Sequence, residues 1–223
     1  MAPTRTHRPI DIGEIITHGV VFDFKNWQGG AVDAAHLPQT VTRLFALLHD
    51  RKIGYVLVGG IAVLHYVEGR NTQDIDLIVD AEALSQLPEI EVSNRDENFA
   101  RGHFSGLRVD LCLAGNPVFA AVRRDYSQRI RSGQQEICVA TVEGLLLTKL
   151  YALPSLYRQQ DFTRVGLYEN DVAALLHKYK TPVDRLLAVL EPHLLETDVS
   201  ELRRIVADIQ QRIERFERGS RDK

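Results

Sequence analysis

Three aspartates are the residues of this chain whose spacing most clearly allows chemistry. Asp74 and Asp76 stand two apart in the run 74–79, and Asp110 stands in a second apolar run, 107–113. Because residues two apart on a strand share one face, the carboxylates of Asp74 and Asp76 should point the same way. If the two runs form neighbouring strands, all three carboxylates converge on one side of a sheet.

Such convergence needs an opposing charge. Two like charges about 4 Å apart repel by about 4 kcal/mol at an effective dielectric constant near 20. Mg²⁺ or Mn²⁺ reverses the sign of that interaction, and carboxylate oxygens suit both ions. The plainer alternative is three exposed carboxylates that are solvated independently. With the glycine pair upstream, the pattern favours a divalent-cation site at Asp74, Asp76 and Asp110.

The glycine pair suits the approach of a phosphate. Gly59 and Gly60 follow the apolar run 53–58 and precede a predicted helix. Glycine lets backbone N–H groups approach a phosphate closely, and the start of a helix adds a favourable dipole. Glycines after a strand are also ordinary turns. The chain has neither a Gly-Lys-Ser/Thr loop nor a GxGxxG pattern, which excludes the P-loop and Rossmann classes.

The elements that must position these residues can be predicted from hydrophobic periodicity. We expect strands at 53–58, 75–79 and 107–113, a hairpin of 129–130 with 136–139, and a short strand at Gly19–Phe24. We expect helices at 40–49, 61–66 and 81–87, one from the N-cap Thr141 to a break at Pro154, and others near 168–179, 182–190 and 199–216.

This order predicts an α+β (α/β) fold with a mixed sheet, flanking helices and a C-terminal helical region. The corresponding divisions are an N-terminal arm at 1–37, a core at 38–140, a helical domain at 141–218 and a tail at 219–223.

The order of strand, Gly59-Gly60, helix, Arg70-Asn71-Thr72 and Asp74-Ile75-Asp76-Leu77 resembles the DNA polymerase β-type nucleotidyltransferase superfamily. Within it, the pattern is most similar to the AbiEii/MenT-like group, which includes toxins of type IV toxin–antitoxin systems. The resemblance covers roughly residues 50 to 180. It implies the nucleotidyltransferase fold, an NTP substrate, Mg²⁺ or Mn²⁺ at the three aspartates, and nucleotide binding by Gly59, Gly60, Arg70 and Thr72. Ile61 departs from the pattern, since many relatives carry Ser or Thr there.

The helical half holds further candidates. Lys149 lies on the apolar stripe of its helix, so it must extend to solvent or find an anionic partner. The resemblance implies that Lys149 and Arg158 bind nucleotide phosphates and that Asp171 assists catalysis as a general base. Arg164 and Asp161 are alternatives for the roles of Arg158 and Asp171. Asp171 equally fits an acid in the first turn of a helix, stabilised by the helix dipole.

Composition limits the remaining classes. The net charge of −3 over 223 residues gives no support to general nucleic-acid binding. Cys112 and Cys138 have no zinc or redox spacing and are expected to be small buried hydrophobes. No apolar stretch suits a membrane span, and the polar start is unlike a signal peptide, so we expect a cytoplasmic protein. The arginines at 123, 124, 129 and 131 favour a solvated surface with ion pairs over an RNA-binding track.

The sequence thus predicts transfer of a nucleoside monophosphate from an NTP to an acceptor hydroxyl. The catalytic residues would be Asp74, Asp76, Asp110, Lys149 and Asp171. The open acceptors are the 3′ end of a tRNA, a protein hydroxyl and a small hydroxylated molecule. A toxin would also have a cognate antitoxin as partner. The alternative is a module of the same fold that binds a nucleotide or a partner without turnover.

Overall fold

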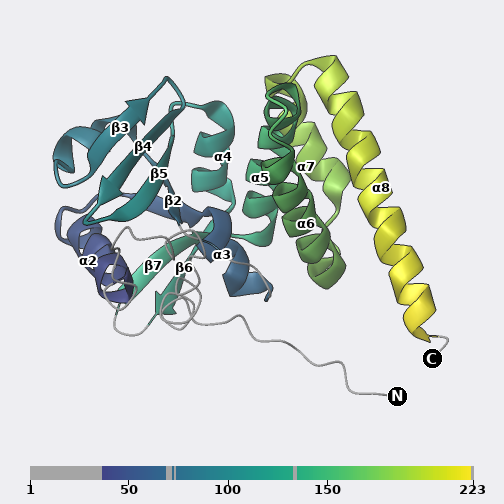
Figure 1. Cartoon of the computed structure of the whole chain (residues 1–223), viewed down its shortest axis with the longest axis horizontal. Helices are drawn as coiled ribbons and strands as arrows, with labels where there is room; N and C mark the ends of the chain where they lie inside the picture. The colour runs from purple at the N-terminus through teal and green to yellow at the C-terminus, as the bar shows by residue number, and fades with distance from the viewer. Residues whose placement is uncertain (1–36, 69–71, 73, 133–134, 222–223) are drawn as a thin grey trace, which may run out of the picture.

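The computed structural model describes residues 37–68, 72, 74–132 and 135–221. The strands lie together with helices α2, α3 and α4, and helices α5 to α8 lie beside them as a second group (Figure 1). The predicted strand at Gly19–Phe24 and the predicted nucleotide ligand Arg70 fall outside the described residues.

One sheet of seven strands carries the acidic residues. Its order is β3-β4-β5-β2-β1-β7-β6, with β2 parallel to β5, β1 parallel to β7 and the other neighbours antiparallel. The strands are β1 (Tyr55–Val58), β2 (Asp74–Val79), β3 (Glu91–Arg95), β4 (Phe99–Phe104), β5 (Leu107–Leu113), β6 (Ser127–Ser132) and β7 (Gln135–Ala140).

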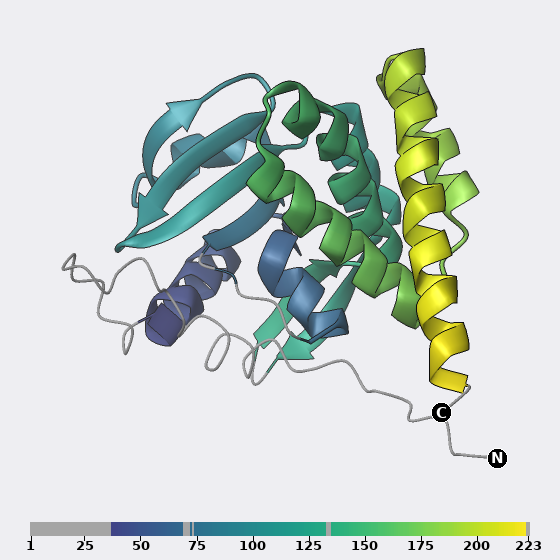
Figure 2. The ribbon, with the colours of Figure 1, turned by 45° about the vertical axis from the view of Figure 1, so that its right-hand side comes forward.

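Helices flank the sheet and then form the rest of the described chain, which confirms the predicted fold class. They are α2 (Leu37–Asp50), α3 (Gly59–Tyr66), α4 (Pro117–Asp125), α5 (Val142–Arg158), α6 (Phe162–Tyr179), α7 (Val183–Leu190) and α8 (Glu196–Arg221), with short 3-10 turns η2 (Ala81–Gln86) and η3 (Glu191–His193). The long helix α8 runs along the outer edge of this helical group (Figure 2). Among the described residues, no helix is both long and apolar enough to cross a membrane.

The two acidic strands are neighbours, which meets the condition for their carboxylates to converge. In their parallel register Asp76 lies beside Asp110, and Asp74 lies beside Arg108. Residues of β5 alternate between fully buried positions and half-buried ones, and Asp110 is on the half-buried side. The apolar residues between the acids, such as Ile75 and Val109, are fully buried in the core. Burial of one face therefore fixes the register that brings the carboxylates together.

The predicted break at Pro154 is wrong. Thr141 caps α5 as expected, since its side chain accepts a hydrogen bond from the N–H of Gly144, but the helix continues through Pro154 to Arg158. A proline inside a helix removes one hydrogen bond and crowds the preceding turn. Leu153 and Leu156, on either side of the proline, are buried in the core. Their packing offsets the cost and keeps the helix whole.

The predicted place of Asp171 in the first turn of a helix is also wrong. Helix α6 begins at Phe162, where Asp161 caps it by accepting a hydrogen bond of 3.1 Å from the N–H of Arg164. Asp171 therefore lies in the middle of α6, where a contribution from the helix dipole is weak. Its side chain is buried, so its neighbours must stabilise it.

Candidate functional site

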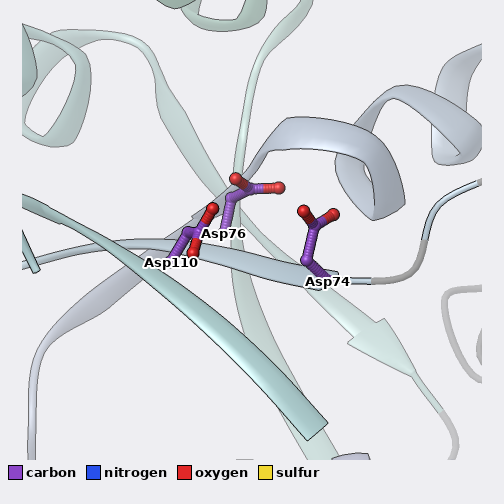
Figure 3. Close-up of side chains that lie close together, drawn as sticks. All are labelled: Asp74, Asp76 and Asp110. Atoms are coloured by element: carbon purple, nitrogen blue, oxygen red, sulfur yellow. The ribbon is translucent and has the colours of Figure 1, made fainter. Parts of the chain in front are cut away.

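Three carboxylates meet at the centre of the sheet. Asp74 and Asp76 project from β2 and Asp110 from β5, on the same side of both strands (Figure 3). One oxygen from each of the three lies within 4.8 Å of the others. All three residues are half-buried, which reduces the screening of their mutual repulsion by water.

The glycine at the end of β1 makes room for one of these carboxylates. Gly59 has a φ of +63°, and a Cβ there would lie 1.8 Å from Oδ2 of Asp76. The next N–H, that of Gly60, donates to the same oxygen over 3.4 Å. Asp76 is thus seated against the first turn of α3, where the helix dipole favours an anion.

A hydroxyl orients a second carboxylate. Oγ1 of Thr72 donates to Oδ1 of Asp74 over 3.1 Å, and Thr72 is buried. Thr72 therefore contacts a metal-ligand candidate directly, in addition to the nucleotide contact that the motif predicts for it.

Two arginines oppose the charge of the three acids. Arg108 donates from Nη2 to Oδ2 of Asp110 over 2.6 Å, and the same nitrogen lies 3.5 Å from Oδ2 of Asp74. Arg101, opposite Asp110 on β4, donates from Nε to Oδ1 of Asp110 over 3.0 Å. Burial alone would raise the pKa of Asp110, but these hydrogen bonds outweigh burial and hold that pKa below its usual value.

The acidic group fits a small divalent cation. Ligand oxygens on opposite sides of Mg²⁺ are about 4.2 Å apart, since each Mg–O bond is about 2.1 Å. The three oxygens all lie within 4.8 Å of one another, so small side-chain rotations suffice to bring them around one ion. An all-carboxylate donor set also favours Mg²⁺ or Mn²⁺ over softer metals. Arg108 competes with such an ion for the oxygens of Asp74 and Asp110.

Asp76 and Asp110 line a cleft of about 930 Å³. One wall is the sheet and the other is formed by helices α5 and α6 with the segment that leads into α8. The residues of the sheet side include Gly59, Asp76, Phe99, Arg101, Asp110 and Cys112, and those of the helical side include Lys149, Tyr151, Arg158, Arg164, Tyr168 and Asp198. Cys112 is thus partly buried on a cleft wall, while Cys138 is partly buried on β7.

Lys149 has the anionic partner that its position demands. Its Nζ lies 2.9 Å from Oδ2 of Asp171, and the two side chains are only 3% and 5% exposed. The same Nζ lies 3.9 Å from the ring centroid of Tyr168. The pair joins α5 to α6 in the helical wall of the cleft, where Lys149 is a lining residue.

The two candidate arginines also line the cleft. Arg158 pairs with Asp198 over 2.7 Å and its side chain is 58% exposed. Arg164 pairs with Asp161 at the N-terminus of α6 and is likewise exposed. Both guanidinium groups can therefore reach an anion in the cleft, and Arg158 is the more exposed of the two.

His65 and the arginines at 123, 124, 129 and 131 are not among the residues that line the cleft. His65 is buried on α3 with its ring 4.8 Å from that of Tyr66. Three of these four arginines form the expected ion pairs: Arg123 with Asp80, Arg124 with Asp125 and Arg129 with Glu136.

Sequence reasoning missed Arg101, Arg108 and Phe99. Arg108 stands two residues before Asp110, so its place on the same face was visible in the spacing. Arg101 and Phe99 reach the site through the hairpin of β4 and β5, which the sequence analysis did not predict.

No family model and no curated protein matches the chain. Among solved structures, an antigenic nucleotidyltransferase-like protein from Paracoccidioides brasiliensis is similar, with 16% identity over 74% of this chain and 90% of that one and a TM-score of 0.47. The solution structure of the antibiotic-resistance factor ANT(2'')-Ia is also similar, with 14% identity over 83% of this chain and 97% of that one and a TM-score of 0.44. Its crystal structure in complex with adenylyl-2"-tobramycin shares 12% identity over 78% and 98%, with a TM-score of 0.43. These values do not establish the function of this chain.

Proposed function

We propose that this chain transfers a nucleoside monophosphate from an NTP to an acceptor hydroxyl. The observation that carries the proposal is the group of three carboxylates, within 4.8 Å of one another, two of which, Asp76 and Asp110, line a large cleft. Exposed arginines line the same cleft. A cation site next to positive side chains suits a polyphosphate substrate, whose charge both can neutralise.

Asp74, Asp76 and Asp110 would hold Mg²⁺ or Mn²⁺. When bound, the ion supplies positive charge that offsets the phosphates and lowers the pKa of the acceptor hydroxyl. The carboxylates are held ready for this by Thr72, by the N–H of Gly60 and by Arg101. Each of these contacts reduces the reorganisation needed when a substrate arrives.

Positive side chains on the helical wall would bind the leaving group. Arg158, with Arg164 as the alternative, is exposed in the cleft and can pair with pyrophosphate. Lys149 and Asp171 are too buried to exchange freely with a substrate, so we assign them as positioning residues that hold α5 against α6.

The reaction forms a bond from the acceptor oxygen to the α-phosphorus and breaks the bond from that phosphorus to the β-phosphate oxygen. Pyrophosphate leaves and the hydroxyl proton passes to solvent. Because its arginine partners hold the pKa of Asp110 low, that carboxylate is a weak base and acts through its charge.

The acceptor divides the proposal into testable branches. A tRNA 3′ end, a protein hydroxyl and a small hydroxylated molecule such as an aminoglycoside all supply the required hydroxyl. The toxin role, with a cognate antitoxin as partner, rests on the resemblance of the 59–77 motif to the AbiEii/MenT-like group. It predicts growth arrest on expression that Asp76→Asn relieves.

The test is incorporation of label from each α-³²P-labelled NTP, with Mg²⁺ or Mn²⁺, into total tRNA, into the protein itself or into aminoglycosides. Asp76→Asn should abolish incorporation. Asp80→Asn is the matched control, because Asp80 follows the same strand but pairs with Arg123 outside the cleft. Equal incorporation by the Asp76→Asn variant and the wild type would refute the site.

One observation favours the alternative of a binding module without turnover. Asp110 is already paired with both Arg101 and Arg108, so the acidic group can persist without a metal ion. In that case NTP binding would be measurable but no acceptor would be labelled under any metal condition.

A further inference from the structure

Strand β4 presents an aromatic ring and an arginine side by side in the cleft. Phe99, Arg101 and His103 are exposed along β4, while the residues between them are buried. Phe99 lies opposite Cys112 and Arg101 lies opposite Asp110, and all four line the cleft. Side chains two apart on a strand stand about 7 Å from each other on one face.

Phe99 is a supported but uncovered ring. It is 45% exposed, although large aromatic side chains usually gain by burial. Phe119 packs edge-on against it with ring centroids 5.3 Å apart, and Tyr151 packs in the same way on Phe119 at 5.9 Å. The ring therefore has a fixed support and retains surface that is open to the cleft.

The backbone at this ring is held rigidly. Oδ1 of Asp96 accepts hydrogen bonds from the N–H groups of Asn98 and Phe99, over 2.7 and 2.8 Å. The N–H of Asp96 donates to the carbonyl of Phe99, and the carbonyl of Asn98 accepts from Leu113 on β5. A platform already fixed in place loses little freedom when a ligand stacks on it.

Arg101 offers a cation at a fixed distance from that platform. Its Nε is bonded to Asp110, and among the described residues its terminal nitrogens make no hydrogen bond. The side chain is 44% exposed. A guanidinium group pairs well with phosphate oxygens through two parallel hydrogen bonds.

We propose that Phe99 and Arg101 form a nucleotide subsite, in which a nucleobase stacks on Phe99 and its phosphate pairs with Arg101. The inference deepens the proposed function, because the bound nucleotide would belong either to the NTP or to a nucleic-acid acceptor. Stacking is tolerant of base identity, since every base has a flat face. The subsite itself needs neither turnover nor a metal ion.

The test separates the two contacts by ligand. Binding of nucleosides and of nucleoside 5′-monophosphates to the full chain is measured by calorimetry in EDTA. Phe99→Leu should lower the affinity for both kinds of ligand by about tenfold, because both stack on the ring. Arg101→Met should lower the affinity for the monophosphates by a similar factor and leave the affinity for the nucleosides unchanged. Matched controls are Val92→Ala, at an exposed apolar position on β3, and Arg129→Met, an exposed arginine on β6.

Two outcomes overturn the inference. One is the absence of monophosphate binding by the wild type. The other is binding that Phe99→Leu and Arg101→Met alter no more than the controls do.

The source of the nucleotide follows from a second set of titrations, with NTPs and with a single-stranded pentanucleotide RNA. If the variants weaken NTP binding, the subsite holds the donor nucleotide, and if they weaken only RNA binding, it holds the acceptor. Monophosphate binding in EDTA requires neither a metal ion nor turnover. Subsite binding without any label transfer would therefore retain this inference while the proposed transferase activity fails.

Discussion

The ammonium group of Lys149 lies 2.9 Å from the carboxylate of Asp171, and both groups are almost fully excluded from solvent. The pair connects the two helices that form one wall of the cleft, and the ring of Tyr168 covers the ammonium group. Burial of two charges is favourable only when each keeps its partner. Each charge therefore depends on the other, and the intact pair holds α5 and α6 together in the wall of the cleft.

Breaking this pair from one side should destabilise the protein strongly. Lys149→Met leaves Asp171 charged and buried, and Asp171→Leu leaves Lys149 in the same state, so each should cost about 3–5 kcal/mol of unfolding free energy. The double variant should recover most of that loss, because it buries no charge. Urea unfolding of all four proteins measures the coupling. Additive losses in the double variant would contradict a direct interaction.

Substitution of Gly59 should affect the acidic site more than its backbone strain explains. Gly59→Ala combines a positive φ with a Cβ directed at Asp76, whereas Gly106 has a φ of +82° and open space around it. Gly106→Ala should therefore cost only about 1–2 kcal/mol for the left-handed conformation. Gly59→Ala should cost more and should also weaken Mn²⁺ binding. Both effects are measurable by urea unfolding and by the electron paramagnetic resonance signal of free Mn²⁺. Equal behaviour of the two variants would contradict the contact between position 59 and Asp76.

Removal of Arg108 should tighten metal binding. Its guanidinium group occupies oxygens of Asp74 and Asp110 that a metal ion would share. Arg108→Met should therefore bind Mn²⁺ roughly tenfold more tightly, a difference of about 1.4 kcal/mol. Without metal the same variant should melt at a lower temperature, since three carboxylates lose a counter-charge. Arg129→Met serves as the control for a change of net charge. Weaker Mn²⁺ binding by the Arg108→Met variant would show that Arg108 supports the ion instead of competing with it.

Alkaline pH should weaken the fold through Tyr66. Its hydroxyl donates to the carbonyl of Ala140 and accepts from Gln128, and burial raises its pKa from 10.0 to about 12. Because the folded state keeps the proton to a higher pH than the unfolded state, this contribution is complete below pH 10 and is lost as pH rises towards 12. At neutral pH the free energy of unfolding of the wild type should exceed that of the Tyr66→Phe variant by about 1–2 kcal/mol. Urea unfolding between pH 9 and 11.5 should show that margin shrinking, and a constant margin would contradict the assignment.

The sequence was sufficient for the acidic strands but not for what surrounds them. Alternation of acidic and apolar residues in 74–79 and 107–113 predicted the strands correctly, because one face of each had to be buried. The hairpin partner β4 was missed, and with it the contact of Arg101 with Asp110, which depends on cross-strand register. Helix α4 was missed although Asn116 and Pro117 are a cap and a first-turn residue that favour one.

The helical half shows the opposite balance. The need of Lys149 for an anion followed from its apolar surroundings, but the identity of the partner did not, because it depends on how α6 packs on α5. The predicted helix end at Pro154 rests on local chemistry alone. Tertiary burial of its neighbours outweighed that local preference.

The acidic group lies where two antiparallel units of the sheet meet. Strands β3, β4 and β5 form one antiparallel unit, β1 and β2 form another, and the parallel pairing of β2 with β5 is the joint between them. Asp74 and Asp76 belong to one unit and Asp110 to the other. An ion held by all three would therefore link the two units and stabilise the pairing of β2 with β5. The amide hydrogens of these two strands would then exchange with solvent more slowly when the ion is bound.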